Sequence, residues 1–386
     1  MGTNGTRCSD PINSTKSVML VGSVDEEHNR LMKLCEAYKS AGWRVTVLGM
    51  DRYKKRQKRY TKDEIEFEYL VRGYGESNWT LLIGYSVWVA CVVLRLLRAR
   101  VDLVHVFEME SGLAVAITAA LRKLVYIYDV QDNYELRHKW PLPVLALIRV
   151  IDHHVVQRAA WLIVPDTSRL TGVFSDFRDK AVIIPNCPPD DGCNGPREPS
   201  LVESVRVLAM GHLAERRGIR LLLQAAQELP GVKILVAGSF PRPELERETR
   251  ACPSVEYLGW VNWKEAIGLG RRVDVIFTFY DPQYTVNRLA NAQKWYDAMM
   301  SSTPVLVNRE VLASKWLEAA GVAYVCEYST AGIVSALQEI KRNKTEARLR
   351  GERARRMFES EFNWDNMSKR LLSAAEKAAF GAAGAH

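Results

Sequence analysis

The chain has 386 residues, of which 47% are hydrophobic and 25% charged, and its net charge is +8. These values are typical of a soluble globular protein with room for two domains, and they exclude a disordered or fibrous chain. The seven cysteines include no Cys-x-x-Cys pair, so neither a zinc site nor a disulfide framework is indicated. The polar N-terminus lacks the apolar core of a secretion signal, and we expect a cytoplasmic protein.

Short apolar runs alternate with helical patterns in the first half. We predict strands at 18–21, 44–48, 103–107, 124–128, 161–165 and 181–185, and helices at 26–40, 112–121 and 150–160. Gly22 follows the first strand. This order predicts parallel βαβ units, whose ligands bind beyond the carboxyl ends of the strands.

A strongly basic segment interrupts this alternation. Seven basic residues and no acid lie from Arg52 to Lys62, and a largely apolar stretch follows from Trp79 to Leu97. A basic cluster beside an apolar helix favours peripheral binding to an anionic membrane, here the inner face. A buried core helix and a solvated basic loop are the alternatives. No recognition motif accompanies the run, so we expect no nucleic-acid partner.

Acidic residues follow the fourth predicted strand, in the order Asp129-Val130-Gln131-Asp132. A catalytic carboxylate is expected at such a strand end, so Asp132 and Asp129 are the candidate catalytic residues. The alternative is that Asp132 or Asn133 only caps the next helix. His153 and His154 are adjacent and would point apart on a helix, so we predict no metal site.

A Pro/Gly-rich and acidic segment at 187–204 marks a linker, after which the alternation resumes. Strands are predicted at 206–210, 233–237, 255–258, 273–279 and 305–307. We therefore predict an α/β fold with two doubly wound, Rossmann-like domains. They span 1–186 and 205–360, and a final helical segment, 361–386, is expected to return to the first domain.

The segment Asn291–Asn308 reads NAQKWYDAMMSSTPVLVN, a helical pattern followed by an apolar strand. Lys294 and Asp297 are three residues apart and share one face at the helix start. Lys294 could hold a diphosphate there, and Asp297 the ribose hydroxyls. The alternative is an ordinary surface ion pair.

Four segments of the second half resemble a known family: Met210-Gly211-His212 with Arg217-Gly218, Val236 to Ser239, Val255 to Val261, and Lys294 to Val305. They resemble glycosyltransferase family 4, whose GT-B fold has two Rossmann-like domains facing a cleft. The resemblance implies nucleotide-sugar binding by Gly22, His212, Arg217, Gly238, Gly259, Tyr280, Lys294 and Asp297, with Arg217 neutralising the donor diphosphate. His212 replaces the usual arginine, Asp297 replaces the usual glutamate, and Leu289 replaces a further glutamate.

The first half is also similar to this family, around Gly22 and His28-Asn29-Arg30, and the resemblance places His28 and Arg30 on the acceptor side. Gln131 stands where the family often has a histidine that contacts the sugar. The chain therefore also resembles the inverting xanthan glucuronosyltransferase type, which is membrane-associated and uses lipid-linked acceptors.

These resemblances imply transfer of a sugar from a UDP- or GDP-sugar to a lipid-linked or cell-surface glycan acceptor, as in polysaccharide biosynthesis, without metal or cofactor. In an inverting reaction Asp132 or Asp129 would be the base, and in a retaining one the carboxylate would only position substrate. Two alternatives remain open: a nucleotide-sugar epimerase of the same fold, and a non-enzymatic membrane-docked scaffold.

Overall fold

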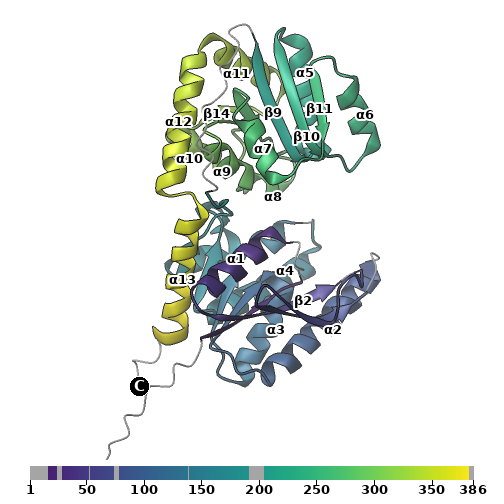
Figure 1. Cartoon of the computed structure of the whole chain (residues 1–386). Helices are drawn as coiled ribbons and strands as arrows, with labels where there is room; N and C mark the ends of the chain where they lie inside the picture. Colours follow the sequence, from purple (N-terminus) through teal and green to yellow (C-terminus); the bar gives the residue numbers. More distant parts are fainter. Residues whose placement is uncertain are drawn as a thin grey trace, which may run out of the picture. The chain divides into compact units, whose positions relative to one another are not determined.

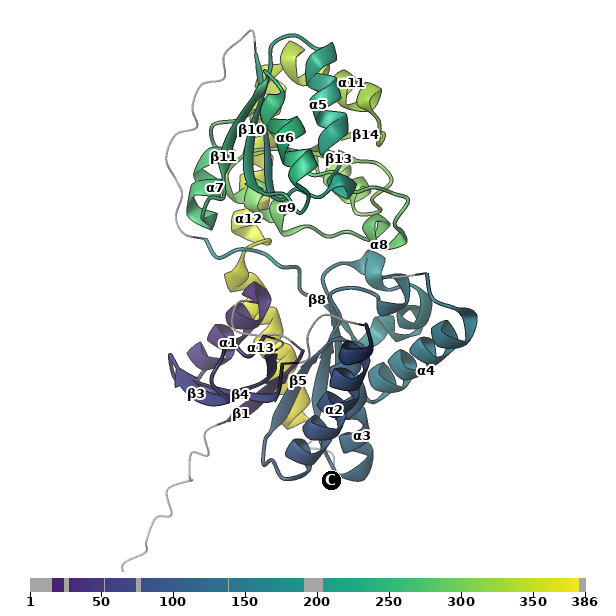
Figure 2. The same ribbon diagram turned by 90° about the vertical axis from the view of Figure 1, so that its right-hand side faces the viewer.

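A computed structural model describes residues 16–23, 28–51, 53–73, 78–137, 139–190 and 204–381. It contains an eight-stranded sheet built from residues up to 183 and a six-stranded sheet built from residue 205 onward. Figures 1 and 2 show helices packed beside each sheet. The predicted α/β class with two doubly wound sheets is confirmed.

The first sheet has the strand order β3-β4-β2-β1-β5-β6-β7-β8. Its strands are β1 (Ser17–Val21), β2 (Arg44–Asp51), β3 (Arg59–Lys62), β4 (Ile65–Arg72), β5 (Leu103–Phe107), β6 (Tyr126–Asp129), β7 (Trp161–Val164) and β8 (Ala181–Ile183). β1 is buried along its whole length and pairs in parallel with β2 and β5, as its continuous apolar sequence favours. The chain reverses its direction across the sheet at β1, which creates a ligand-binding position beyond the ends of β1 and β5.

The helices of this part are α1 (Asn29–Ser40), α2 (Asn78–Leu97), α3 (Glu108–Leu121) and α4 (Leu142–Arg158), with short 3-10 turns η1 (Tyr134–Leu136), η2 (Thr167–Arg169) and η3 (Gly172–Lys180). α4 begins eight residues before the predicted start at 150. Pro143 lies in its first turn, where proline is tolerated because the N–H groups there have no helical partner.

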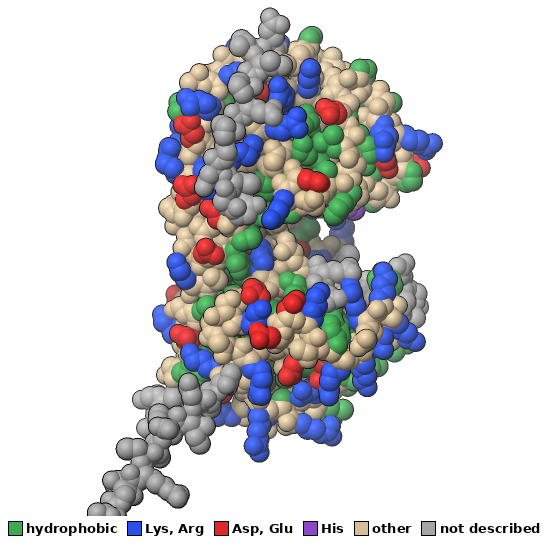
Figure 3. Space-filling model, in the orientation of Figure 1, with side chains coloured by type: hydrophobic (Ala, Val, Ile, Leu, Met, Phe, Trp, Pro, Cys, Tyr) green, Lys and Arg blue, Asp and Glu red, His purple; other side chains and the backbone are tan. Residues whose placement is uncertain are grey.

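The basic segment contains an element that the sequence did not predict. β3 lies inside it and pairs antiparallel with β4 at the edge of the sheet. Apart from Arg52, which lies outside the described residues, most of its basic side chains are exposed, and Arg59 pairs with Glu68 at 2.6 Å. Figure 3 shows Lys and Arg side chains on this half of the chain. Apolar and acidic residues alternate at the start of β4, which is typical of a strand. The prediction for this region rested on the charge of the preceding basic segment and did not use that pattern.

α2 is buried on one face only. Trp88, Val92 and Leu96 are buried, whereas Ile83 and Leu94 are exposed. Among helices of the described residues, none combines the length and apolar character needed to cross a bilayer.

The second sheet is entirely parallel and has the order β11-β10-β9-β12-β13-β14. Its strands are β9 (Val205–His212), β10 (Val232–Ser239), β11 (Val255–Gly259), β12 (Val275–Phe277), β13 (Val305–Asn308) and β14 (Ala323–Cys326). The chain runs outward from β9 to β11 and then returns to β12 on the other side of β9. Ligands of open α/β sheets bind beyond the carboxyl ends of strands at such a reversal.

The second set of helices comprises α5 (Ile219–Glu228), α6 (Pro243–Ala251), α7 (Trp263–Gly270), α8 (Thr285–Arg288), α9 (Gln293–Met300), α10 (Ser314–Ala319), α11 (Thr330–Arg342), α12 (Lys344–Ser360) and α13 (Trp364–Phe380), with the 3-10 turn η4 (Glu215–Arg217). α5 buries Ile219, Leu222 and Leu223 in a core that includes Val207 and Val236 of the sheet.

The packing divides the chain into two compact units. One consists of Met1–Asp129, His154–Leu162 and Leu372–His386, and the other of Val130–His153 and Ile163–Leu371. Within the first unit, the end of α13 contacts the region of β1 and β2. Glu376 pairs with Lys16 at 2.8 Å, and the Phe380 ring lies 6.0 Å from Trp43.

Candidate active site

A cavity of about 290 Å³ lies at the carboxyl edge of the second sheet, where β9 and β10 end. It is lined by Met210, Gly211, His212, Ala237, Gly238, Ser239, Trp260, Val261, Trp263, Ala266, Lys294 and Asp297. Four residues that the sequence assigns to the nucleotide sugar therefore lie together: His212, Gly238, Lys294 and Asp297. The cavity occupies the position that the strand order favours for a ligand.

Two glycines form the floor of this cavity. Gly211 and Gly238 have φ angles of +87° and +151°, which disfavour any residue with a Cβ. A Cβ added at Gly238 would lie 1.9 Å from the Gly211 carbonyl oxygen. The ends of β9 and β10 can therefore approach each other this closely only because Gly238 has no side chain. The absence of side chains at both glycines also leaves room for the cavity.

Lys294 lies in the first turn of α9 and is partly buried. Burial and the neighbouring Arg217 lower the pKa of Lys294 to about 8, whereas Asp297 has the opposite effect. The charge of Lys294 is thus poorly compensated in the free protein. An anion bound beside it would favour the protonated amine.

Arg217 stacks on an aromatic ring, with its Cζ 4.2 Å from the centroid of Tyr280. Its Nη1 is buried and has no hydrogen-bond partner among the described residues. The Tyr280 N–H donates to Asn308 Oδ1 at 2.9 Å, and Asn308 Nδ2 donates to the Tyr280 carbonyl at 3.1 Å. Neither Arg217 nor Tyr280 lines this cavity; both line a different one. Tyr280 orients Arg217, which keeps an open N–H donor.

The carboxylate of Asp297 is buried and accepts a hydrogen bond from Trp263 Nε1 at 3.1 Å. Sequence reasoning missed Trp263. Its helix has a capping box, in which Asn262 and Glu265 each accept the other's backbone N–H. That pattern locates the start of α7 in the sequence, but it does not show that the indole reaches Asp297.

Gly259, like Arg217 and Tyr280, is a predicted nucleotide-sugar residue of this half that does not line the cavity. Gly259 ends β11 with a φ of +71°. The next two residues, Trp260 and Val261, line it instead, and Trp260 is 78% exposed. Gly259 thus sets the chain direction before the two residues that reach the site.

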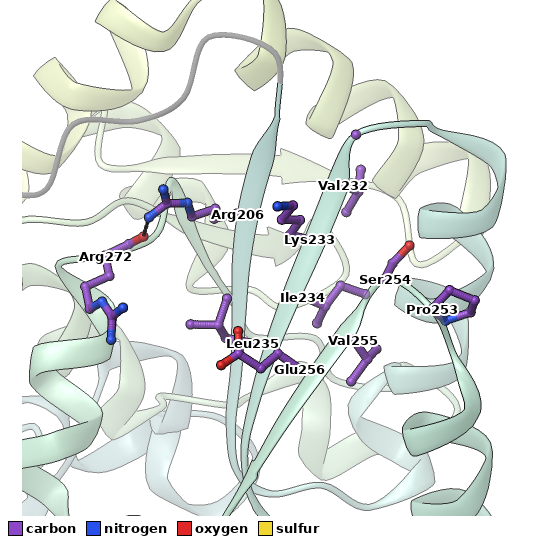
Figure 4. A pocket seen from close by; sticks show the side chains of 11 residues that line it. Arg206, Val232, Lys233, Ile234, Leu235, Pro253, Ser254, Val255, Glu256 and Arg272 are labelled. Carbon is purple, nitrogen blue, oxygen red and sulfur yellow. Dashed lines mark hydrogen bonds between the residues drawn. The ribbon is translucent and has the colours of Figure 1, made fainter.

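A larger cavity of about 590 Å³ lies at the opposite ends of β9, β10 and β11. Figure 4 shows the side chains that line it, including Arg206, Lys233 and Glu256. Arg206 Nη1 donates to the carbonyl of Arg272 at 3.1 Å. This cavity contains none of the predicted site residues and lies at the strand starts, so it is not the candidate active site.

Asp129 ends β6 and is completely buried. Arg30 Nη2 lies 2.9 Å from its Oδ2, and His105 Nε2 lies 3.2 Å from the same oxygen. Burial alone would raise the pKa of Asp129, but Arg30 and His105 lower it below its ordinary value. Its burial argues against the catalytic role that the sequence allows.

Arg30 is likewise 1% exposed, so its side chain supports the fold and is not on an acceptor-facing surface. His105 was not predicted, because it lies inside an apolar strand. Its Nδ1 is 3.0 Å from the buried Tyr38 hydroxyl, which completes a four-residue polar network with Asp129.

The two other residues predicted near the first strand take local roles. Gly22 is buried at the end of β1, where its N–H donates to the Leu48 carbonyl at 3.1 Å. His28 caps α1, and its Nδ1 accepts from the Leu31 N–H at 3.2 Å.

Asp132, by contrast, is accessible: its side chain is 45% exposed and pairs with Arg169 Nη2 at 2.8 Å. The alternative of helix capping is not observed. Asn133 precedes η1 without making a side-chain capping bond, and its Nδ2 donates to the Arg169 carbonyl at 3.0 Å. Of the two candidate acids, Asp129 at the end of β6 is buried and Asp132 is accessible to a substrate.

Within the described part of the chain, no group of three or more His, Cys, Asp or Glu side chains is arranged to hold a metal ion. His154 lies against Arg158, and His153 lies against the Phe177 ring at 5.2 Å.

Two protein families match the chain. The family described as "Glycosyl transferase 4-like domain" matches residues 28–187, and the one described as "Glycosyl transferase-like" matches residues 216–373. No curated protein sequence matches the chain.

Solved structures of low sequence identity share the fold over nearly the whole chain. Sucrose-phosphate synthase from Thermosynechococcus elongatus has a TM-score of 0.75 at 15% identity and covers 95% of this chain and 100% of its own. HepE from Anabaena, solved with UDP, has a TM-score of 0.69 at 13% identity and covers 93% and 98%. A glycosyltransferase from Rickettsia africae has a TM-score of 0.67 at 12% identity and covers 95% and 99%. The two family matches and the fold together place this chain among the GT-B glycosyltransferases similar to family 4.

Proposed function

We propose that this glycosyltransferase takes its sugar from a nucleoside diphosphate sugar bound in the cavity beyond β9 and β10. The observation that carries the proposal is the pair Lys294, which lines this cavity, and Arg217, which lies outside the lining but close enough to lower the pKa of Lys294. The first has a depressed pKa, and the second has a buried N–H without a partner among the described residues. Both features disfavour the empty site and favour an anion, as expected where a diphosphate binds.

The chemical task is to stabilise the diphosphate as it leaves the sugar. Lys294, Arg217 and the first N–H groups of α9 supply a positive field for that charge. Asp297, held by Trp263, has the chemistry to accept hydrogen bonds from the ribose hydroxyls. These groups suffice for a reaction without metal, in which the protein's own cations take the role that Mg²⁺ has in other transferases.

Asp132 is the proposed catalytic carboxylate. In an inverting reaction it takes the proton of the acceptor hydroxyl as the sugar–oxygen bond forms and the bond to the diphosphate breaks. In a retaining reaction it positions substrate, and the leaving diphosphate removes the proton. The anomeric configuration of the product distinguishes the two outcomes.

For the donor we propose a UDP-sugar carrying a hexosyl or glucuronosyl group, and GDP is the second choice. HepE, which shares the fold, has been solved with UDP and with UDP-glucose. Thermal unfolding with UDP and with GDP, followed by a transfer assay with a panel of nucleotide sugars, tests this choice. Stabilisation by GDP alone would reverse it.

For the acceptor we propose a lipid-linked or cell-surface glycan, reached from the cytoplasmic face of a membrane in polysaccharide biosynthesis. Support comes from the exposed basic side chains around β3 and the exposed aliphatic side chains of α2. Sedimentation with vesicles tests the docking. Binding to vesicles with anionic lipid, lost in high salt and absent with neutral vesicles, is expected. Equal binding to anionic and neutral vesicles would contradict a contribution of the basic side chains to docking.

An epimerase of the same fold would convert a nucleotide sugar in the absence of any acceptor. A membrane-docked scaffold would show no thermal stabilisation by UDP or GDP. Incubation of each nucleotide sugar alone, followed by product analysis, therefore separates the transferase from the epimerase, and the thermal shift with UDP or GDP separates it from the scaffold.

A further inference from the structure

Five charged side chains surround a third cavity, of about 380 Å³, in the unit that contains Val130–His153 and Ile163–Leu371. They are Asp132, Arg137, Arg169, Arg216 and Arg217. Four cations therefore face one carboxylate, and three remain if Arg217 is assigned to the donor diphosphate. Such an excess is costly in a concave site unless an anion compensates it.

Arg169 is the central residue of this cavity because it is both buried and incompletely bonded. Its side chain is 5% exposed, and Nη2 pairs with Asp132 at 2.8 Å. Its Nε and Nη1 are buried and have no hydrogen-bond partner among the described residues. A buried guanidinium with two open donor nitrogens loses hydration without recovering hydrogen bonds, and an oxyanion would supply them.

The backbone around Arg169 is firmly held. The Asp166 side chain accepts from the Ser168 N–H at 2.8 Å and so caps η2, which ends at Arg169. The Arg169 carbonyl accepts from Asn133 Nδ2 at 3.0 Å. These bonds hold the backbone of Arg169, and the ion pair with Asp132 holds its guanidinium. The open donor nitrogens therefore have a fixed position, unlike those of a flexible surface arginine.

We propose that Arg169, with Arg216, binds a phosphate group of the acceptor substrate and so places the acceptor hydroxyl at Asp132. This inference rests on the proposed transferase function and on Asp132 as its catalytic carboxylate. A phosphate fits better than a carboxylate because two negative charges offset more of the cationic excess, and its oxygens can take both open donors of Arg169. The donor occupies the other cavity, at Gly211 and Gly238.

The test uses inorganic phosphate as the probe and the full chain saturated with UDP, so that the donor site is filled. Phosphate affinity is measured by calorimetry at constant ionic strength, with acetate and chloride as competing anions. The variants are Arg169→Met, Arg169→Lys and Arg216→Met. Arg250→Met, which removes an exposed arginine from α6, is the matched control.

We expect wild type and Arg250→Met to bind phosphate in preference to acetate. Arg169→Met should bind it at least tenfold more weakly, and Arg169→Lys should restore little, because lysine lacks the planar pair of donors. Arg216→Met is exposed and should fold normally, so a several-fold loss there supports the site even if Arg169→Met is unstable.

Phosphate affinity unchanged in both Arg169→Met and Arg216→Met, or no phosphate binding by the UDP-loaded wild type, would overturn the inference. A preference for acetate would overturn the choice of phosphate. Stabilisation by UDP is recorded separately in every variant. Its absence in wild type would refute the proposed donor site, whereas its presence without phosphate binding refutes only the second site.

Discussion

Replacing Lys294 with methionine should make the protein more stable and unable to hold its donor. The pKa of Lys294 is lowered from 10.5 to about 8. Each pKa unit corresponds to about 1.4 kcal/mol, so the charged amine costs the folded state at most about 3 kcal/mol. Because the side chain is partly exposed and Asp297 loses a neighbouring cation, we expect a gain of about 1–2 kcal/mol at pH 7.

The sign of this effect depends on pH. A base whose pKa is depressed by folding destabilises the folded state fully below the folded pKa, near 8, and the cost disappears as the pH rises toward 10.5. The advantage of Lys294→Met should therefore be largest at pH 7 and fade by pH 10. Donor affinity of the wild type should fall as the pH rises above 8, because the neutral amine attracts the diphosphate less.

The assay is urea unfolding at pH 7 and pH 10, with and without UDP. At a UDP concentration of 100 times its dissociation constant, wild type should gain about 2.7 kcal/mol. Lys294→Met should gain almost nothing. Lys233→Met, an exposed position on β10, is the control and should change stability by less than about 0.5 kcal/mol. A Lys294→Met protein that is less stable than wild type at pH 7, yet retains the UDP effect, would refute the reasoning.

Three further substitutions test the site. Asp132→Asn should lower the transfer rate by about 10²-fold or more while donor affinity is unchanged, and normal turnover in a transfer assay would exclude Asp132 as the catalytic carboxylate. Gly238→Ala should lose UDP binding in calorimetry, because its Cβ would meet the Gly211 carbonyl at 1.9 Å; tight binding would show that the strand ends can separate. Trp263→Phe removes the hydrogen bond to Asp297 and should weaken UDP binding several-fold; an equal loss for 2′-deoxy-UDP would argue against a ribose contact.

The alternating strands and helices of both halves could be predicted from the sequence, because buried parallel strands leave short apolar runs that end in glycine or acid. Lys294 and Asp297 could be assigned to the site from local sequence alone, because residues three apart on a helix lie on the same face. The motif around Arg217 was recognised through its family resemblance.

What could not be predicted depends on long-range packing. Asp129 and Asp132 are equivalent in the sequence, and only the position of Arg30, 99 residues away, shows that the first is buried and paired. Trp263 reaches Asp297 across 34 residues, and Arg169 reaches Asp132 from the 3-10 turn after the next strand. No local pattern encodes such pairs, because each depends on which strands become neighbours.

The buried pair of Arg30 and Asp129 has a consequence for how related enzymes can diverge. Loss of either partner leaves an uncompensated charge in the interior, which costs about 3–5 kcal/mol, whereas replacing both with apolar residues can be nearly neutral. In an alignment of this family, the two positions should therefore change together, with an ion pair in some members and two apolar residues in others. His105 should follow them, since its ring shares the same carboxylate oxygen.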